Sequence, residues 1–133
     1  MTIDRINPPG LHTPPGYHHV TLVPAGRTAY LAGQCPLDPA GMVVSPDILR
    51  QVDQVATNTL TALTSVPATP EQVVRTVIYV VSDDRTVLSS VWDRLRLSPI
   101  GAAFTSASTL LGVAQLGYPG QLVELDVTAA LPD

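Results

Sequence analysis

The stretch QLVELDVTAAL, residues 121–131, decides the fold because it alternates like a β-strand with one buried face. Side chains along a strand point to opposite faces in turn. The apolar residues Val123, Leu125, Val127, Ala129 and Leu131 therefore share one face, and Glu124, Asp126 and Thr128 share the other. This pattern predicts a strand packed on a core, with two carboxylates on the side away from that core.

The composition favours a subunit of an oligomer. The chain has 133 residues, of which 45% are hydrophobic and only 14% are charged. This is apolar for a soluble monomer, since a small domain exposes most of its surface. No run of eighteen apolar residues occurs, so we expect no transmembrane helix. The remaining interpretation is a chain of one domain, 1–133, that buries surface against copies of itself.

The charged residues exclude several function classes. The net charge is −4 and all seven basic residues are arginines, so we expect no nucleic-acid partner. Without lysine, Schiff-base catalysis is also excluded. The single cysteine, Cys35, allows no internal disulfide, and residues 1–16 lack the pattern of a secretory signal. Both observations favour a cytoplasmic protein.

The first third of the chain predicts irregular structure followed by a hairpin. Residues 1–16 contain four prolines and two glycines, which predicts an irregular arm. Residues 18–25 and 28–36 each have the pattern of a short strand, and the Ala25-Gly26 turn lies between them. We therefore expect these two strands to pair with each other.

Residues 45–66 form the clearest predicted helix, because their apolar side chains recur with helical spacing. Ser45 is the expected N-cap, with Pro46 at the first helical position. Further along, Thr69-Pro70-Glu71-Gln72 has the form of a capping box, which predicts a short helical turn.

The remaining elements complete an α+β fold. We expect a central strand at 73–82, a helix at 85–97, and strands at 106–116 and 121–131. The order β-β-α-β-α-β-β indicates one mixed sheet with two helices on one face. The other face then lacks a cover within the chain, which supports self-association independently of the composition.

Glu124 and Asp126 are the first candidates for chemistry. Two residues apart on a strand, they project to the same side, roughly 6–7 Å apart at Cα. A solvated strand face is the simplest interpretation of such a pair. If that face meets a neighbouring subunit, however, a carboxylate there needs hydrogen-bond partners, and Glu124 becomes a candidate for proton transfer.

Other potential sites have weaker patterns. His18 and His19 are adjacent on a predicted strand and point to opposite faces, so we expect no metal site. Cys35 has no neighbouring histidine and fits a small buried side chain better than a nucleophile. Ser106, Ser108 and Thr109 lack a nucleophile elbow, and we expect them to bind backbone or a ligand. Gly33 and Gly112 lie within strand patterns, which favours close approach of a ligand or another strand.

Several ordered segments together resemble the RidA/YjgF reactive-intermediate deaminase family. The match covers about residues 14 to 131 and is most specific in Gly33-Gln34-x-Pro36-Leu37-Asp38-Pro39 with Gly41, in Asn58, and in the closing run from Val123. The segments are PGYHHV (15–20), TAYLAGQCPLDPAGMVV (28–44), QVDQVATNTLTAL (51–63), QVVRTVIYVVSDD (72–84) and GVAQLGYPGQLVELDVTAAL (112–131).

The resemblance implies a chorismate-mutase-like fold and a homotrimer whose sheets line a central barrel. It also implies small-molecule clefts between subunits, in which complete family members hydrolyse enamines and imines to 2-keto acids and ammonia without a cofactor. In those members an arginine binds the substrate carboxylate, a glutamate of the last strand handles the hydrolytic water, and a tyrosine closes the cleft.

Carried over by position, the tyrosine matches Tyr17 and the glutamate matches Glu124. The arginine is replaced by Ser108, a common serine by Ala32, and an asparagine of the second helix by Ser89. We therefore predict Glu124 as the catalytic residue. The predicted substrate-binding residues are Tyr17, Ala32, Gly33, Ser89, Ser108 and Thr109.

The missing arginine suggests altered specificity. A guanidinium binds a carboxylate through two oriented hydrogen bonds, whereas serine offers one hydroxyl and no charge. We expect a 2-iminocarboxylate to be a poor substrate and a neutral or cationic molecule to fit better. The leading hypothesis is an enamine/imine deaminase-type hydrolase; the alternatives are a non-catalytic trimer that binds a small molecule or a partner protein, and a tailoring enzyme for condensation or isomerisation.

Overall fold

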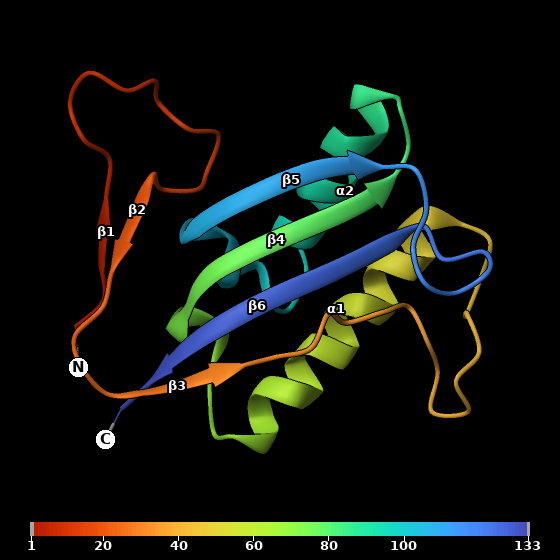
Figure 1. Cartoon of the computed structure of the whole chain (residues 1–133), viewed down its shortest axis with the longest axis horizontal. Coiled ribbons are helices and arrows are strands. Elements are labelled where there is room, and N and C mark those ends of the chain that lie inside the picture. The colour runs from red at the N-terminus through yellow and green to blue at the C-terminus, as the bar shows by residue number, and fades with distance from the viewer. Residues whose placement is uncertain (1, 133) are drawn as a thin grey trace.

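A four-stranded mixed sheet forms the centre of the computed structural model, which describes residues 2–132 (Figure 1). Its strand order is β3-β6-β4-β5, with β4 and β5 parallel and β6 antiparallel to both of its neighbours. The strands are β3 (Arg27–Tyr30), β4 (Val73–Val81), β5 (Ala107–Val113) and β6 (Val123–Leu131). The long strands β4 and β6 therefore lie at the middle of the sheet, as their apolar sequences predict.

The alternation predicted for the last strand is confirmed. Val123, Leu125 and Val127 are almost fully buried, whereas Glu124 and Asp126 between them are partly exposed. The buried side chains belong to the main hydrophobic core, which is continuous with the helices. The acidic side chains therefore lie on the opposite face of the sheet.

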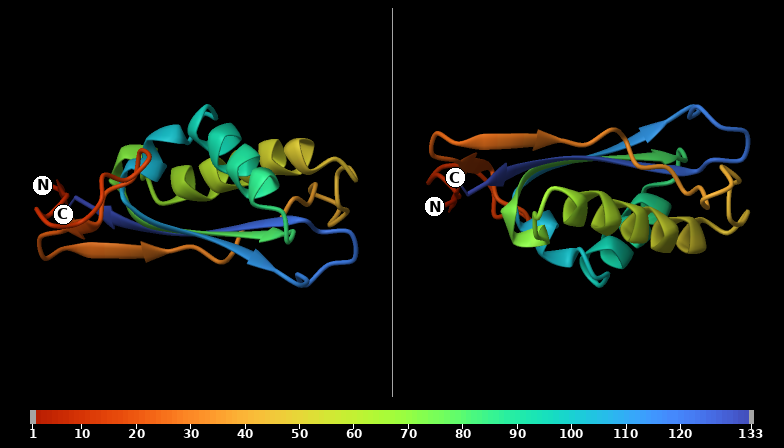
Figure 2. Two further views of the ribbon diagram at one scale, coloured as in Figure 1. Left: turned by 90° about the horizontal axis from the view of Figure 1, so that it is seen from above. Right: turned by 90° about the horizontal axis from the view of Figure 1, so that it is seen from below.

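Both predicted helices cover the same face of the sheet (Figure 2). They are α1 (Ile48–Ser65) and α2 (Arg85–Arg96). Val52, Val55 and Leu63 of α1 have no exposed surface, and Val91 and Leu95 of α2 are equally buried. The α+β class, the mixed sheet and the one-sided helices are thus confirmed.

The predicted start of the first helix is wrong by two residues. Asp47, not Ser45, is the N-cap, and its carboxylate accepts a hydrogen bond of 2.9 Å from the Leu49 amide. Ser45 instead accepts a hydrogen bond from the Asp47 amide, so it shapes the turn that precedes the cap. The capping box at Thr69 and Gln72 is confirmed, and it opens a short 3₁₀ turn, Pro70–Gln72.

The predicted N-terminal hairpin is wrong. The first strand of the expected pair shortens to β2 (Val20–Leu22), and it pairs with β1 (Asp4–Ile6), within the arm that we expected to be irregular. Of that arm, Met1 lies outside the described residues. The connection 23–26 carries Pro24, which has no N–H to donate, and β3 pairs with β6 instead.

The chain after β3 contains a β-bulge against β6. The predicted strand 28–36 ends as a regular strand at Tyr30, but Leu31 donates a backbone hydrogen bond to Val127 and Gln34 forms a bridge with Leu125. The three residue steps from Leu31 to Gln34 thus lie opposite only two residue steps of β6, from Val127 to Leu125. The extra residue lies at Ala32–Gly33, and a bulge of this kind redirects the neighbouring side chains.

The face of the sheet away from the helices is largely bare in the single chain. Tyr30 at the β3 edge is 80% exposed, and Leu111 of β5 is 42% exposed. A large apolar surface of this kind in a small domain usually marks an interface. Within residues 2–132, no helix is long and apolar enough to cross a membrane.

Candidate functional site

A cleft of about 630 Å³ opens beside the edge strand β5. It brings together four of the predicted substrate-binding residues: Tyr17, Ser89, Ser108 and Thr109. The remaining lining residues are Pro15, Trp92, Asp93 and Leu110. The volume suits a small metabolite, and the lining combines an aromatic wall with hydroxyl groups.

The N-terminal arm forms one wall of this cleft and is fixed by several contacts. The Trp92 indole N–H donates a hydrogen bond of 3.2 Å to the Pro15 carbonyl. The Tyr17 ring packs edge-on against Trp92, and its hydroxyl lies 3.3 Å from a ring nitrogen of His12. Gly16 has a φ of +108°, which only glycine adopts easily, and this turn aims Tyr17 at the cleft.

Ser108 is fully engaged with its own chain. Its hydroxyl accepts a hydrogen bond of 2.6 Å from the Thr76 hydroxyl and donates one of 3.0 Å to the Ser106 carbonyl. Its proton is therefore already used, and it carries no charge. Where the family resemblance places a carboxylate-binding arginine, this cleft has a neutral group that is tied to the protein.

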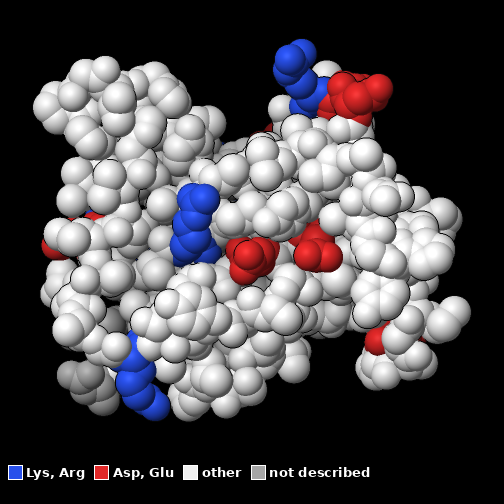
Figure 3. Space-filling view, viewed as in Figure 1, with Lys and Arg blue, Asp and Glu red and all other residues white. Residues whose placement is uncertain are grey.

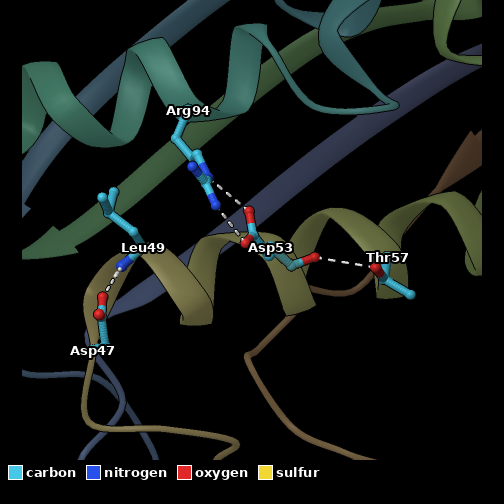
Figure 4. Close-up of polar contacts among 5 residues, drawn as sticks. All are labelled: Asp47, Leu49, Asp53, Thr57 and Arg94. Carbon is cyan, nitrogen blue, oxygen red and sulfur yellow. Dashed lines mark hydrogen bonds and ion pairs between the residues drawn. The ribbon is translucent and has the colours of Figure 1, made fainter.

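The two nearby arginines of α2, Arg94 and Arg96, contact other residues and do not take the place of the arginine that Ser108 replaces. Arg94 of α2 binds both carboxylate oxygens of Asp53 on α1, at 2.8 and 2.7 Å, and so ties the two helices together (Figure 4). Arg96 lies over the Trp92 ring, 5.9 Å from its centroid, and packs against Gly16 behind the arm.

One cation does reach the rim of the cleft, from the other face of the sheet. Arg75 of β4 donates a hydrogen bond of 2.9 Å from its guanidinium to the Thr109 hydroxyl. Sequence alone could not identify this contact, because it depends on the register that pairs Val77 of β4 with Thr109. Figure 3 shows this face, where a basic side chain lies beside acidic ones at the centre and further charged side chains lie at the margins.

Glu124 lies in a different place, beside the bulge. Its Oε1 atom accepts a hydrogen bond of 3.1 Å from the side-chain amide of Gln121 and one of 3.3 Å from the Cys35 thiol. Its Oε2 atom lies against Gly33, where a Cβ would come closer than 3.0 Å. The predicted catalytic carboxylate and predicted Gly33 are thus neighbours. We call this group of Gly33, Cys35, Gln121 and Glu124 the acidic corner.

The Cys35 thiol is not a nucleophile in this environment. Burial raises its pKa from 9.0 to about 11, and the hydrogen bond and negative charge of Glu124 act in the same direction. Only on the order of 1 in 10⁴ thiols is ionised at pH 7, so the group stays a hydrogen-bond donor. The expectation of a small side chain without nucleophilic function agrees with this.

The loop after the bulge is fixed by Asn58 of α1. Its side-chain amide donates to the carbonyl groups of Cys35 and Leu37, at 3.0 and 2.9 Å. An open depression of about 340 Å³ lies over this loop and includes Gly33 and Tyr118 among its lining residues. This gives a structural role to Asn58, a residue that the resemblance marked without assigning a function.

Within one chain, the acidic corner and the cleft are separate. Glu124 is level with Tyr79 of β4 and Leu111 of β5, whereas Ser108 lies three residues earlier on β5. Two strand spacings and three residue steps put Glu124 and Ser108 roughly 14 Å apart at Cα. Ala32 lines neither place; it borders a third hollow, between β3 and the end of α1.

Gln121 is a site residue that the sequence analysis missed, although a signal was present. In the stretch 121–131 it stands at an apolar position of the alternation, and the structure buries it to 3% exposure. A buried amide requires hydrogen-bond partners, which points to a neighbour such as Glu124. As for metals, residues 2–132 contain no group of three or more His, Cys, Asp or Glu placed to hold an ion.

The fold and the position of the acidic corner can now be compared with known proteins. Residues 11–131 match the family model described as endoribonuclease L-PSP. The chain belongs to this family. Solved structures of the Rid group agree: YyfB from Yersinia pestis, a Rid-family protein of unknown function, has 33% sequence identity and a TM-score of 0.86, covering 98% of this chain and all of that one.

Two further proteins are similar to this chain. YyfA from Yersinia pestis, also described as of unknown function, has 26% identity and a TM-score of 0.68, covering 98% of this chain and 100% of that one. The protein DfrA from Myxococcus xanthus is 31% identical over 117 residues, which are 85% of this chain and 83% of DfrA. The RidA/YjgF assignment made from the sequence is therefore confirmed, and the family's activity remains to be argued for this member.

Proposed function

We propose that this Rid-family protein is an enamine/imine deaminase-type hydrolase, which acts on a small reactive metabolite in clefts between the subunits of a homotrimer. The proposal assigns catalysis to Glu124 and substrate contact to the cleft lined by Tyr17, Ser89, Ser108 and Thr109. It also places the protein in the cytoplasm, requires no cofactor, and gives the protein altered substrate specificity.

The observation that carries this proposal is the environment of Glu124. A carboxylate with two donors on one oxygen, and a second oxygen that packs against a glycine and accepts no hydrogen bond from residues 2–132, is suited to proton transfer to a small molecule. A solvated strand face would not need these donors. The bare apolar face around it supports a complex in which a second chain brings its own cleft to this corner.

The chemistry of such a site is imine hydrolysis. An enamine first takes a proton from water on carbon and becomes the iminium ion. Water then attacks the iminium carbon while Oε2 of Glu124 accepts a water proton, which gives a neutral amino alcohol. That proton passes to the nitrogen, the C–N bond breaks as the C=O bond forms, and the hydroxyl proton returns to water through the carboxylate, so the products are ammonia and a carbonyl compound. Each step needs only one carboxylate and oriented water.

Altered specificity follows from Ser108. Its hydroxyl is committed to Thr76 and Ser106, so it does not hold a substrate carboxylate as an arginine would. We propose that the preferred substrate lacks the carboxylate of amino-acid-derived imines. Asp93 in the cleft lining adds negative charge and acts in the same direction.

A non-catalytic trimer that binds a small molecule is the second candidate. It is favoured by the same saturation of Ser108, because a cleft with that hydroxyl occupied and an aromatic wall suits binding without chemistry. Cleavage of RNA, which the description of the family model suggests, is disfavoured here: the chain has net charge −4 and no lysine, so it offers little attraction to phosphates.

The test is ammonia release from two imines, one carrying a carboxylate and one neutral. A threonine dehydratase generates the first in situ, and a flavin amine oxidase acting with O2 on a primary alkylamine generates the second. We expect faster hydrolysis of the neutral imine, relative to a Rid protein with the arginine. Glu124→Gln should lower kcat/KM by roughly 10²- to 10⁴-fold, and a native mass three times the 14.0 kDa of one chain is expected.

Asp126→Asn is the matched control, because Asp126 lies on the same strand and face, two residues further on. It should leave kcat near the wild-type value. Equal activity of Glu124→Gln and the wild type would contradict the catalytic assignment. A chain without activity on either imine that still binds neutral ligands at the cleft would favour the binding protein.

A further inference from the structure

In the acidic corner, Glu124 has more side-chain contacts than a carboxylate on a solvated strand face would have. Glu124 has two chemically different oxygens in this structure: Oε1 receives both side-chain donors, and Oε2 faces the space left by Gly33. The bulge brings Gly33 to the point of closest approach, where the missing Cβ leaves room for Oε2. The two oxygens therefore have different surroundings.

Gln121 is a rigid donor. It is 3% exposed, and its amide nitrogen donates to the Val123 carbonyl and to Oε1 of Glu124, both at 3.1 Å. Its amide oxygen accepts from the Tyr118 backbone N–H at 3.2 Å. The opposite orientation of the amide would set its oxygen against two acceptors, so the contacts fix which end faces Glu124.

Cys35 is the second donor, on the other side of the carboxylate. Its thiol has one proton and two acceptors within reach, Oε1 of Glu124 at 3.3 Å and the Gly33 carbonyl at 3.6 Å. The loop that carries it is held by Asn58 from α1, so the sulfur position does not depend on Glu124. Burial and the carboxylate keep the thiol pKa at about 11, and the donor therefore persists at neutral pH.

We infer that Gln121 and Cys35 are positioning residues, which hold Oε1 of Glu124 and leave Oε2 as the oxygen that exchanges protons with water and substrate. This inference rests on the proposed function and deepens it. A carboxylate held by two donors cannot rotate to exchange its oxygens without breaking both hydrogen bonds. Oε2 therefore stays in its place against Gly33, and little reorganisation is needed during the reaction.

The inference is tested by kinetics with a rescue. Cys35→Ala should lower kcat roughly 10-fold with KM unchanged, since one hydrogen bond to a charged group is lost. Cys35→Ser, which restores an O–H donor, should recover most of that loss. Gln121→Met, of similar length, should lower kcat by roughly 10- to 100-fold, again without a change in KM.

A second measurement is independent of turnover. The chain has one cysteine, so ¹³Cβ labelling gives a single resonance that reports ionisation of the Cys35 thiol. Glu124→Gln should lower the pH of half-ionisation, because it removes the negative charge that disfavours the thiolate. Gln121→Met should raise it, because the amide of Gln121 favours the thiolate in the folded chain.

Each outcome decides a separate point. An unchanged thiol titration in Glu124→Gln would overturn the inference whatever the activity. A shifted titration with wild-type kcat in Cys35→Ala and Gln121→Met would overturn the positioning role. A wild-type protein inactive on every imine would overturn the proposed function and the catalytic part of this inference, while the titration would still decide whether the contacts exist.

Discussion

The cleft beside β5 and the acidic corner differ in nearly every physical property. The cleft has room, about 630 Å³, but its central hydroxyl, on Ser108, is saturated by neighbours. The corner has a poised carboxylate but little space, since even a methyl group at Gly33 would collide with Glu124. The cleft has room for a small molecule, and the corner has the carboxylate to which we assign proton transfer.

Under the proposed function, a single chain carries two incomplete halves of one site. The halves lie on different strands, roughly 14 Å apart, and the corner lies on the sheet face that the helices leave uncovered. In the proposed homotrimer, another copy brings its cleft against the corner without refolding of either chain. The comparison thus makes the assembly part of the proposed mechanism, and changes confined to one half should have effects that differ in kind.

The largest expected effect comes from filling the corner. Gly33→Ala places a Cβ closer than 3.0 Å to Oε2 of Glu124, so the carboxylate must move from its donors. Activity on the preferred imine should fall roughly 100-fold or more, because misplacement of about 1 Å costs this much. The control is Gly117→Ala, where a Cβ would meet nothing within 4 Å. Equal activity of the two variants would show that Oε2 is not the working oxygen.

The next effect comes from adding charge to the cleft. Ser108→Arg restores the cation that the family resemblance places here, and it should lower KM for a carboxylate-bearing imine by roughly 10-fold or more. The neutral imine should gain nothing. Ser108→Ala separates loss of the Thr76 contact from the gain of charge. If both imines respond alike, specificity is not set at position 108.

A smaller effect appears in the alkaline pH dependence of stability. The folded Cys35 thiol has a pKa of about 11 against an ordinary 9.0, so between these values the unfolded chain binds fewer protons than the folded one. Stability should therefore fall as the pH rises through this window. Cys35→Ala should lose less stability between pH 9 and 11 than the wild type, as measured by thermal melting. Parallel curves would show that the thiol ionises freely.

The smallest effect should come from the helix pair. Arg94 holds the pKa of Asp53 below its ordinary value, so any stabilisation is present above the usual carboxyl range and is lost as the pH falls through it. The pair is about half exposed at each end, and such pairs stabilise little. Arg94→Gln should leave kcat and KM unchanged and shift the melting temperature barely measurably. A large loss of activity would mean that α2 moves during catalysis.

The sequence predicts local features of this fold well. The alternation from Val123 to Leu131, the two helices and the Thr69 capping box depend on neighbours within a few residues, and all are confirmed. Strand partners depend on the whole chain. Nothing near Arg27 shows that it joins β6 instead of Val20–Leu22, and nothing near Asp4 shows that the arm supplies a strand.

The candidate site was predicted unevenly for the same reason. The resemblance placed six substrate-binding residues in a single set, and the structure gathers only four of them in one cleft. Gly33 lies instead at the acidic corner, and Ala32 borders another hollow. The donors of Glu124 were missed, because Cys35 lies 89 positions away in sequence and meets it only across the bulge. Polarity at a buried position, as at Gln121, was the signal that local reasoning could have used.

The bulge also has an evolutionary consequence. Because two residues between Leu31 and Gln34 face a single residue of β6, deletion of the Ala32 codon would restore regular pairing with β6. Gly33 would then leave its place beside Glu124, although Glu124, Cys35 and Gln121 were unchanged. A lineage could lose or regain the proposed chemistry through residue count alone, so aligned identities would be a poor guide to which members carry it.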